Sequence, residues 1–205
     1  MNPATALELV SWRRETAALY AGVRDQADPA AAHALWRDGR DTLLRSHPQS
    51  PVHADDPIRV RGVPYWPYDP ALRWTVPVEP VSRSQRLAID AGPDGVTHLD
   101  QVGWVTLPSP IGRRLAVWWL DQYGGGLFLP LRDATAGRIS YGGGRYLLDT
   151  AKGADLGSAS PRLVIDLNFL YHPSCRYDDH WVCPLAPEHN IIDVPIRAGE
   201  RLAPP

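Results

Sequence analysis

The feature that most constrains the fold is a succession of short β-type segments that begins near Pro51. Segments expected to form strands cover residues 72–79, 85–91, 98–107, 113–121, 127–132, 145–149, 161–168 and 193–197. Turn-forming Pro and Gly residues separate these segments, and no helix-length segments alternate with them as they do in a parallel βαβ sheet. The pattern predicts about eight to ten strands in a mostly antiparallel β-barrel or β-sandwich.

Two of the segments indicate their places in a sheet. Residues 72–79 alternate between apolar and polar side chains, but Pro77 cannot donate a backbone hydrogen bond, so an edge strand is expected. Residues 115–120 (LAVWWL) are apolar on both faces. A strand of this kind is typical of the centre of a sheet.

The first fifty residues have a different character. Leu7, Val10 and Leu19 belong to a rough helical stripe, and Asp28-Pro29 is a typical start for a second helix. That helix is expected to stop near residues 46–48. We therefore predict an α+β chain with a single domain over residues 1–205. Residues 1–50 form its N-terminal helical pair, and residues 51–205 form its β-rich core, which ends in a Cys/Pro-rich loop.

The composition excludes several classes of protein. Hydrophobic residues make up 44% of the chain and charged residues 21%, as in a globular core, and the net charge of −2 gives no attraction for nucleic acid or an anionic membrane. No apolar stretch reaches the roughly 18 residues of a membrane-spanning helix. Charges at Arg13 and Arg14 interrupt the N-terminus, so no secretory signal is expected. These features predict a cytoplasmic location, where thiols stay reduced.

Two glycine triplets, at residues 124–126 and 142–144, resemble phosphate-binding loops only superficially. Neither is followed by Gly-Lys-Ser/Thr or opens a helix after a parallel strand, so both are interpreted as tight turns. The sequence also contains no Gly-x-Ser-x-Gly elbow and no His-Glu-x-x-His pair. No motif therefore specifies a reaction, and whether the chain is an enzyme stays open.

Residues 171–190 (YHPSCRYDDHWVCPLAPEHN) hold both cysteines of the chain and three of its seven histidines. Thiolate and imidazole bind zinc, and the spacings His172-x-x-Cys175 and His180-x-x-Cys183, with His189 nearby, suit ligation of one ion. The paired Cys-x-x-Cys of a zinc ribbon is missing, and several prolines stiffen the segment. The alternative is a Pro-rich closing loop with buried thiols. No cofactor is favoured, and zinc is kept as the alternative.

A second group of polar residues lies at the ends of predicted strands. Its members carry charged, amide or hydroxyl groups: Arg132, Asp133, Thr135, Tyr141, Arg145, Asp166, Asn168 and Tyr171. Asp166 and Asn168 are expected to share one strand face, opposite Ile165 and its neighbours. Buried carboxylates need a cation or several donors, and arginine supplies both. The group is therefore either a structural network or a pocket in which one arginine is left for a ligand.

Several blocks of the sequence resemble the bacterial domain-of-unknown-function family 1684. They include LFLPLRDATAGRISYGGGRYLL, LVIDLNFLYHPSCRYDDHWVCPLAPEHN, PVHADDPIRVRGVPYWPYDP, IRAGERL and the early WRRE, in order over almost the whole chain. The resemblance implies a single-domain, β-rich protein and supplies no reaction.

The resemblance also implies which residues of this chain correspond to residues typical of the family. They are Arg132, Asp133, Thr135, Tyr141, Gly144, Arg145, Asp166, Asn168, Tyr171, Cys175, Cys183 and Asn190. This chain departs from the family pattern at His172, and His180 and His189 lie outside it. The departures weaken a metal site that depends on histidine.

These observations lead to a functional hypothesis of a small-molecule-binding or small-molecule-processing domain. Its predicted ligand-binding residues are Arg132, Asp133, Thr135, Tyr141, Arg145, Asn168, Tyr171 and Asn190. Arg145 holds an anionic or carbonyl group of the ligand, and residues 175–190 form the rim. Asp166 is the candidate for proton transfer, because burial raises the pKa of a carboxyl.

Two alternatives remain. One is a metalloprotein that uses Cys175 and Cys183 with His172, His180 or His189. The other is a non-catalytic structural or interaction module, which predicts an exposed aromatic patch. That patch would contain Trp66, Tyr68 or Trp181.

Overall fold

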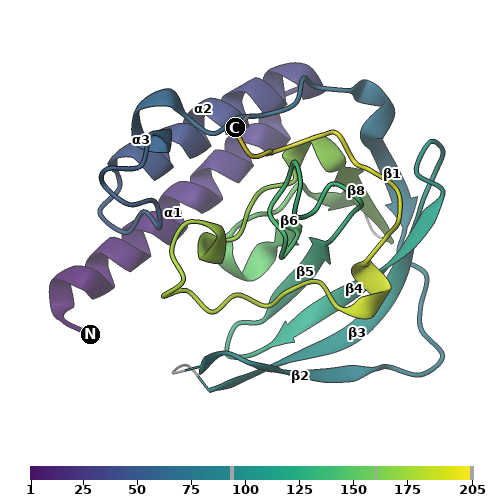
Figure 1. The fold of residues 1–205 in the computed structure, drawn as a ribbon. Helices are drawn as coiled ribbons and strands as arrows, with labels where there is room; N and C mark the ends of the chain where they lie inside the picture. Colours follow the sequence, from purple (N-terminus) through teal and green to yellow (C-terminus); the bar gives the residue numbers. More distant parts are fainter. Residues whose placement is uncertain (93–94, 160, 204–205) are drawn as a thin grey trace.

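Two long helices lie side by side along one edge of the molecule, and two antiparallel sheets form the rest (Figure 1). The computed structural model describes residues 1–92, 95–159 and 161–203. Helix α1 covers Pro3–Asp25 and helix α2 covers Pro29–Ser46. A single turn of helix, α3 (Ile58–Arg61), follows them. No helix in the described part of the chain has both the length and the apolarity needed to cross a membrane.

Side-chain caps define where the long helices begin. The side chain of Asn2 accepts a hydrogen bond from the backbone N–H of Thr5 at 2.9 Å, and Asp28 accepts one from Ala30 at 3.0 Å. A proline occupies the first turn of each helix, where its missing N–H costs nothing. The predicted start at Asp28-Pro29 is confirmed.

Buried aromatic residues join the helices to each other and to the sheets. Trp36 of α2 is completely buried, and its Nε1–H donates to the hydroxyl of Tyr20 on α1 at 3.1 Å. The same indole ring packs against Phe169, with ring centroids 5.1 Å apart. Gly39 lets the helices approach, because a Cβ there would lie 2.5 Å from Cδ1 of Leu19.

The larger sheet has five strands in the order β2-β3-β4-β5-β6. Its strands are β2 (Arg86–Asp90), β3 (Val96–Leu107), β4 (Arg113–Asp121), β5 (Gly126–Leu131) and β6 (Arg145–Asp149). The smaller sheet has the order β1-β8-β7, with β1 (Arg73–Pro77), β7 (Ser158–Ala159) and β8 (Arg162–Asp166). Backbone hydrogen bonds between Glu79 and Trp104 connect the segment after β1 to β3.

The observed architecture confirms the α+β class with an N-terminal helical pair. Within the described residues the two sheets remain open and are not closed into a barrel, so the sandwich-like arrangement holds. Strand β4 occupies the centre of its sheet and β1 lies at an edge, as residues 115–120 and Pro77 predicted. The glycine triplets form turns, with Gly124, Gly125 and Gly144 at positive φ.

Two local predictions were wrong. Residues 193–197 form no strand, because side chains bond to the backbone at its middle: the N–H of Ile196 donates to Asp133 at 2.7 Å, and the carbonyl of Ile196 accepts from Arg145 at 2.9 Å. Asp166 and Asn168 do not share a strand face. Strand β8 ends at Asp166, whose carboxylate accepts from the N–H of Asn168 at 3.1 Å and begins a 3₁₀ turn, η4 (Leu167–Phe169). Local bonding of this kind competes with the strand.

Candidate functional site

Arg145, the predicted ligand-binding arginine, is occupied by the protein itself. Only 1% of the residue is exposed. Its Nη1 donates to the carbonyls of Ala198 at 2.5 Å and Glu200 at 3.0 Å, and its Nη2 donates to the carbonyl of Ile196 at 2.9 Å and to Asp133 Oδ1 at 3.1 Å. Both terminal nitrogens therefore hold the C-terminal segment, and only the buried Nε lacks a partner in the described chain.

Asp133 and its neighbours complete this network. The Asp133 carboxylate accepts hydrogen bonds from the N–H and the hydroxyl of Thr135, besides those from Arg145 and Ile196. Arg132 points outward: it is exposed, and its Nε donates to the carbonyl of Gly142 at 2.9 Å. The structural-network alternative describes these contacts better than a ligand pocket does.

Asp166 and Asn168 form a second, separate set of contacts. The Asp166 carboxylate accepts from the Asn168 amide at 2.7 Å and from the Tyr68 hydroxyl at 3.2 Å, and Arg73 lies 3.6 Å away. The Asn168 amide also exchanges hydrogen bonds with the backbone of Asp69 at 2.9 Å. Burial raises the pKa of Asp166. These contacts attach residues 68–69 to the end of β8.

Asn190 is likewise a tether within the structure. It lies at the end of η6 (Glu188–Asn190) and is completely buried. Its Oδ1 accepts from Trp118 Nε1 at 2.8 Å, and its Nδ2 donates to the carbonyl of Ala116 at 2.9 Å. Both partners belong to β4, so Asn190 fixes the C-terminal segment to the centre of the larger sheet.

A pocket of about 80 Å³ lies elsewhere, between the two long helices, the end of β6 and residues 171–183. Its wall is rich in aromatic rings: Trp12, Tyr20, Trp36, Tyr146, Tyr171 and Tyr177. Polar groups also line it: Thr16, Arg40, Asp149, Lys152, His172, Ser174 and Cys183. Of the predicted ligand-binding residues, Tyr171 is the one that lines this pocket, whereas Arg145 and its network do not.

Asp149 is the most unusual group in the pocket wall. It is 3% exposed, and its Oδ1 has no hydrogen-bond partner in the described chain. Its Oδ2 lies 3.8 Å from Nζ of Lys152, which is itself largely exposed. Burial raises the pKa of this carboxyl, and Lys152 offsets only part of that effect. Native structures rarely leave a buried polar atom unpaired without a reason.

A β-bulge brings Asp149 onto the same side of β6 as Tyr146. Residues three apart in a regular strand face opposite sides. Here Phe128 pairs with Asp149 and Pro130 pairs with Tyr146, with a register shift between Leu129 and Pro130. Because Phe128 and Pro130 are two residues apart, their partners share a face. The extra residue in β6 thus aims both side chains at the pocket, as bulges beside functional sites often do.

Arg40 closes the opposite wall but is already paired. It forms an ion pair with Glu200, which is completely buried, and lies over the Tyr171 ring at 4.6 Å. Its Nη2 donates to the carbonyl of His172 at 3.1 Å. Glu200 also accepts from the N–H of His172 at 2.6 Å. The positive charge of Arg40 is therefore neutralised within the protein.

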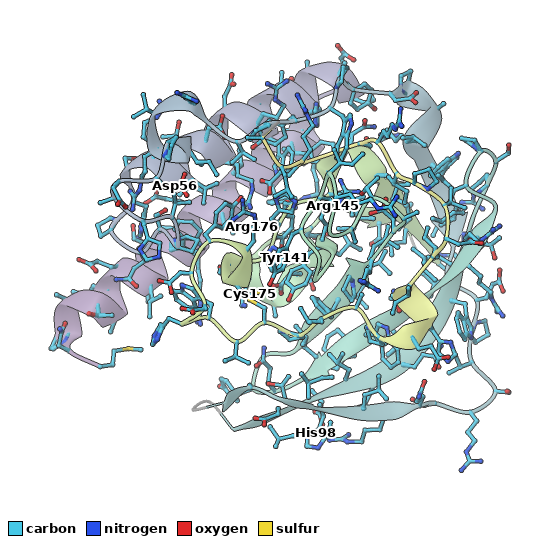
Figure 2. All side chains as sticks on the ribbon, in the orientation of Figure 1. Asp56, His98, Tyr141, Arg145, Cys175 and Arg176 are labelled. Carbon is cyan, nitrogen blue, oxygen red and sulfur yellow. The ribbon has the colours of Figure 1, made fainter. Side chains whose placement is uncertain are left out.

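The two cysteines meet at the rim. The N–H of Cys175 donates to Sγ of Cys183 at 3.4 Å. Figure 2 shows Tyr141 and Cys175 close together, with Arg145 farther up. Both thiols are free and half-buried. The hydrogen bond from Cys175 lowers the pKa of Cys183 to about 6, while the same contact raises that of Cys175.

The described residues offer these thiols no metal site. No group of three or more His, Cys, Asp or Glu side chains is placed to hold an ion within residues 1–92, 95–159 and 161–203. His172 lies with Nε2 against the N–H of Tyr141 at 3.3 Å and Nδ1 3.4 Å from Glu200. His180 is exposed, and His189 packs on Trp104.

The three aromatic residues of the interaction-module alternative are half-buried. Trp66 lies against the guanidinium of Arg145, 5.1 Å from it, and Tyr68 donates to Asp166. Trp181 neighbours His180 in the Cys-containing segment. Each of the three therefore contacts the protein and keeps part of its surface exposed.

Comparison with known proteins identifies the family. Residues 59–201 match the family described as "Protein of unknown function (DUF1684)". The chain belongs to the DUF1684 family. An uncharacterized protein from Haloarcula marismortui has a solved structure that is similar to this DUF1684 chain, with 29% sequence identity and a TM-score of 0.57. The match covers 81% of this chain and 90% of that protein. No curated protein matches the chain.

The sequence did carry a signal for this pocket, which the strand-based reasoning missed. On α1, Trp12, Thr16, Leu19 and Tyr20 follow the i, i+4, i+7, i+8 spacing of one helix face. On α2, Trp36 and Arg40 are four residues apart. Large aromatic residues mixed with polar ones on an inward face are typical of a pocket wall. Asp149 gave no such signal, because its missing partner is visible only in three dimensions.

Proposed function

We propose that this DUF1684 protein binds a small molecule through a positively charged or N–H-donating group, in the pocket between the helical pair and β6. The observation that carries the proposal is the buried Asp149 carboxylate, whose Oδ1 lacks a partner in the described chain beside a wall of aromatic rings. Concave sites with apolar walls and a few polar groups are the usual form of a ligand site.

The electrostatics of the wall favour an amine over an anion. An unpaired buried polar group costs about 1–3 kcal/mol, and an ammonium or amide N–H at Asp149 removes that cost. Aromatic faces attract cations as well, and Tyr20 and Tyr146 line the pocket. An anion finds no free partner at Arg40, because Glu200 already neutralises it. An anionic ligand at Arg145 has no support either, because that guanidinium bonds to the chain itself.

The volume limits what enters. About 80 Å³ is the liquid volume of roughly three water molecules. The pocket therefore suits a small head group, such as an ammonium or methylammonium, with the rest of the ligand toward the mouth. Lys152, which is largely exposed, lies 3.8 Å from Oδ2 of Asp149, so Oδ1 is the oxygen that is left for the ligand.

The direct test is Asp149→Asn. At neutral pH the unfolded Asp149 is ionised, whereas the folded state holds it at a raised pKa, so ionisation opposes folding. The asparagine variant removes that conflict. At pH 7 we expect its free energy of unfolding to exceed that of the wild type by about 1 kcal/mol, the lower bound of the cost of an unsatisfied buried group. The difference should shrink as the pH falls toward 4 and below, where the unfolded wild-type carboxyl also becomes protonated.

Binding is measured on the same variant. A thermal-shift and calorimetry series with methylammonium, longer primary amines and matched neutral alcohols should show amine binding to the wild type and none to Asp149→Asn. Asp166→Asn is the matched control: it alters a buried aspartate outside the pocket, whose partners are Asn168 and Tyr68. It should keep amine binding. Retained amine binding in a less stable Asp149→Asn variant would refute the proposal.

A further inference from the structure

We propose that Cys183 and Cys175 form a thiol pair that a hydroperoxide oxidises to a disulfide at the rim of the pocket, with Cys183 attacking first. The geometry carries this inference. The Cys183 sulfur accepts the N–H of Cys175 at 3.4 Å, and both residues are half-buried. The inference does not depend on which ligand the pocket binds.

The surroundings assign different roles to the two sulfurs. Hydrogen bonds from the Cys175 side chain and backbone stabilise a thiolate at Cys183, and Lys152 adds a favourable charge. They lower the pKa of Cys183 to about 6, so it is a thiolate at neutral pH. Cys175, which donates to that thiolate, keeps its proton. The nucleophile is therefore Cys183, which also lines the pocket.

The chemistry balances with one hydroperoxide. The Cys183 thiolate attacks the peroxide oxygen, the O–O bond breaks, and the leaving hydroxide or alkoxide takes up a proton. Cys183 becomes a sulfenic acid. Cys175 then attacks the Cys183 sulfur, the S–O bond breaks, and the hydroxyl leaves as water with the Cys175 proton. Two thiols are oxidised to one disulfide, and the peroxide is reduced to water, or to water and an alcohol.

The first step prepares the second. While Cys183 is a thiolate, its hydrogen bond holds the proton on Cys175 and raises the pKa of Cys175. A sulfenic acid is neutral at this position, so that restraint disappears. The hydrogen bond from Tyr141 to Cys175 remains, and it favours the Cys175 thiolate. Tyr141 is thus a positioning residue for the second step.

The segment between the cysteines is able to carry a cross-link. It contains the 3₁₀ turn η5 (Ser174–Arg176) followed by irregular chain up to Cys183, so no helix or strand has to break. The two cysteines are eight positions apart. In the reduced protein the Cys183 sulfur lies 3.4 Å from the backbone nitrogen of Cys175, so the two residues are close neighbours in the folded chain.

The test is intact-mass analysis of untagged, reduced protein treated with one equivalent of hydrogen peroxide. The wild type should lose two hydrogens and both alkylatable thiols. Cys175→Ser should instead gain one oxygen, trapped by dimedone on Cys183. Cys183→Ser should stay unmodified under the same exposure. Tyr141→Phe should lengthen the lifetime of the sulfenic acid in an otherwise wild-type chain.

Two outcomes would overturn the inference. One is a wild-type protein that keeps both free thiols after peroxide. The other is a Cys183→Ser variant whose Cys175 is oxidised as fast as Cys183 is in Cys175→Ser. Far-ultraviolet circular dichroism and the melting temperature of each serine variant establish that it is folded. If one fails to fold, iodoacetamide alkylation of the wild type over a pH series decides: Cys183 should react at a lower pH than Cys175, and the reverse order would overturn the inference.

Discussion

Replacing Arg145 by methionine separates a structural arginine from a ligand-binding one. The side chain donates to the carbonyls of Ile196, Ala198 and Glu200 and to the carboxylate of Asp133, all in the interior. Removing one partner of a buried ion pair costs about 3–5 kcal/mol. The three carbonyls add to that cost, whereas Asp133 keeps its donors from Thr135 and Ile196, which reduces it.

We therefore expect Arg145→Met to lower the free energy of unfolding by about 4 kcal/mol, near the middle of the range for a broken buried pair. For a domain of this size each kcal/mol corresponds to about 2–4 °C in Tm, so the melting temperature should fall by roughly 8–16 °C. Urea unfolding at pH 7 measures the free energy. Hydrogen exchange at the Ile196 amide, which donates to Asp133, localises the loss to the C-terminal segment.

Arg132→Met is the matched control. It removes an arginine from the same region, but one that is exposed and donates to a single carbonyl, that of Gly142. Its effect should stay within about 0.5 kcal/mol, as for most surface substitutions. A wild-type urea midpoint for Arg145→Met, together with unchanged exchange at Ile196, would refute the structural role. It would return Arg145 to the list of ligand-binding residues.

Two further predictions concern the helical side of the molecule. Gly153 has φ +90°, and a Cβ there would lie 3.1 Å from the backbone of Ala17. Gly153→Ala should therefore lower the free energy of unfolding, measured in urea, by about 1–2 kcal/mol. It should also weaken amine binding, because the added Cβ moves α1 away from β6. Burial, together with Arg37, lowers the pKa of His33 to about 4, so the unfolded chain binds this proton from about pH 6.5 downward and the folded chain does not. The free energy of unfolding of the wild type should therefore rise between pH 4 and 6.5, and it should rise less in His33→Phe. Urea midpoints at pH 4.5 and 7 measure the rise in each protein, and an equal rise in both would contradict this reasoning.

The strands were the most predictable part of the structure. The predicted ranges for β4 and β6 match the observed strands, because both segments are apolar on two faces and end at charged residues. Residues 193–197 show the limit of such patterns. They alternate like a strand, but Asp133 and Arg145 bond to the backbone of Ile196, and these two residues lie about 50–60 positions earlier in the chain. No local pattern reveals a partner at that distance.

The candidate site was predictable only in its chemistry. The pairing of Arg145 with a carboxylate follows from the cost of burying either alone, and the structure supplies that partner in Asp133. Whether the arginine is also free for a ligand depends on the carbonyls that surround it, which the sequence does not show. The pocket was missed because its walls come from α1, α2, β6 and residues 171–183, which meet only in the folded chain.

The position of the pocket relative to the family match suggests how its parts divide their work. The matched region, residues 59–201, contains the groups with perturbed pKa values, Asp149 and Cys183. Both long helices lie outside that match, although they supply the rings of Trp12 and Trp36 and the guanidinium of Arg40. The pairing of Arg40 with Glu200 joins the two parts. The reactive groups thus belong to the portion that defines the family, while the helices set the shape of the opposite wall. We therefore expect substitutions on the inward face of α1 and α2 to change which amine binds, and substitutions of Asp149 to abolish amine binding.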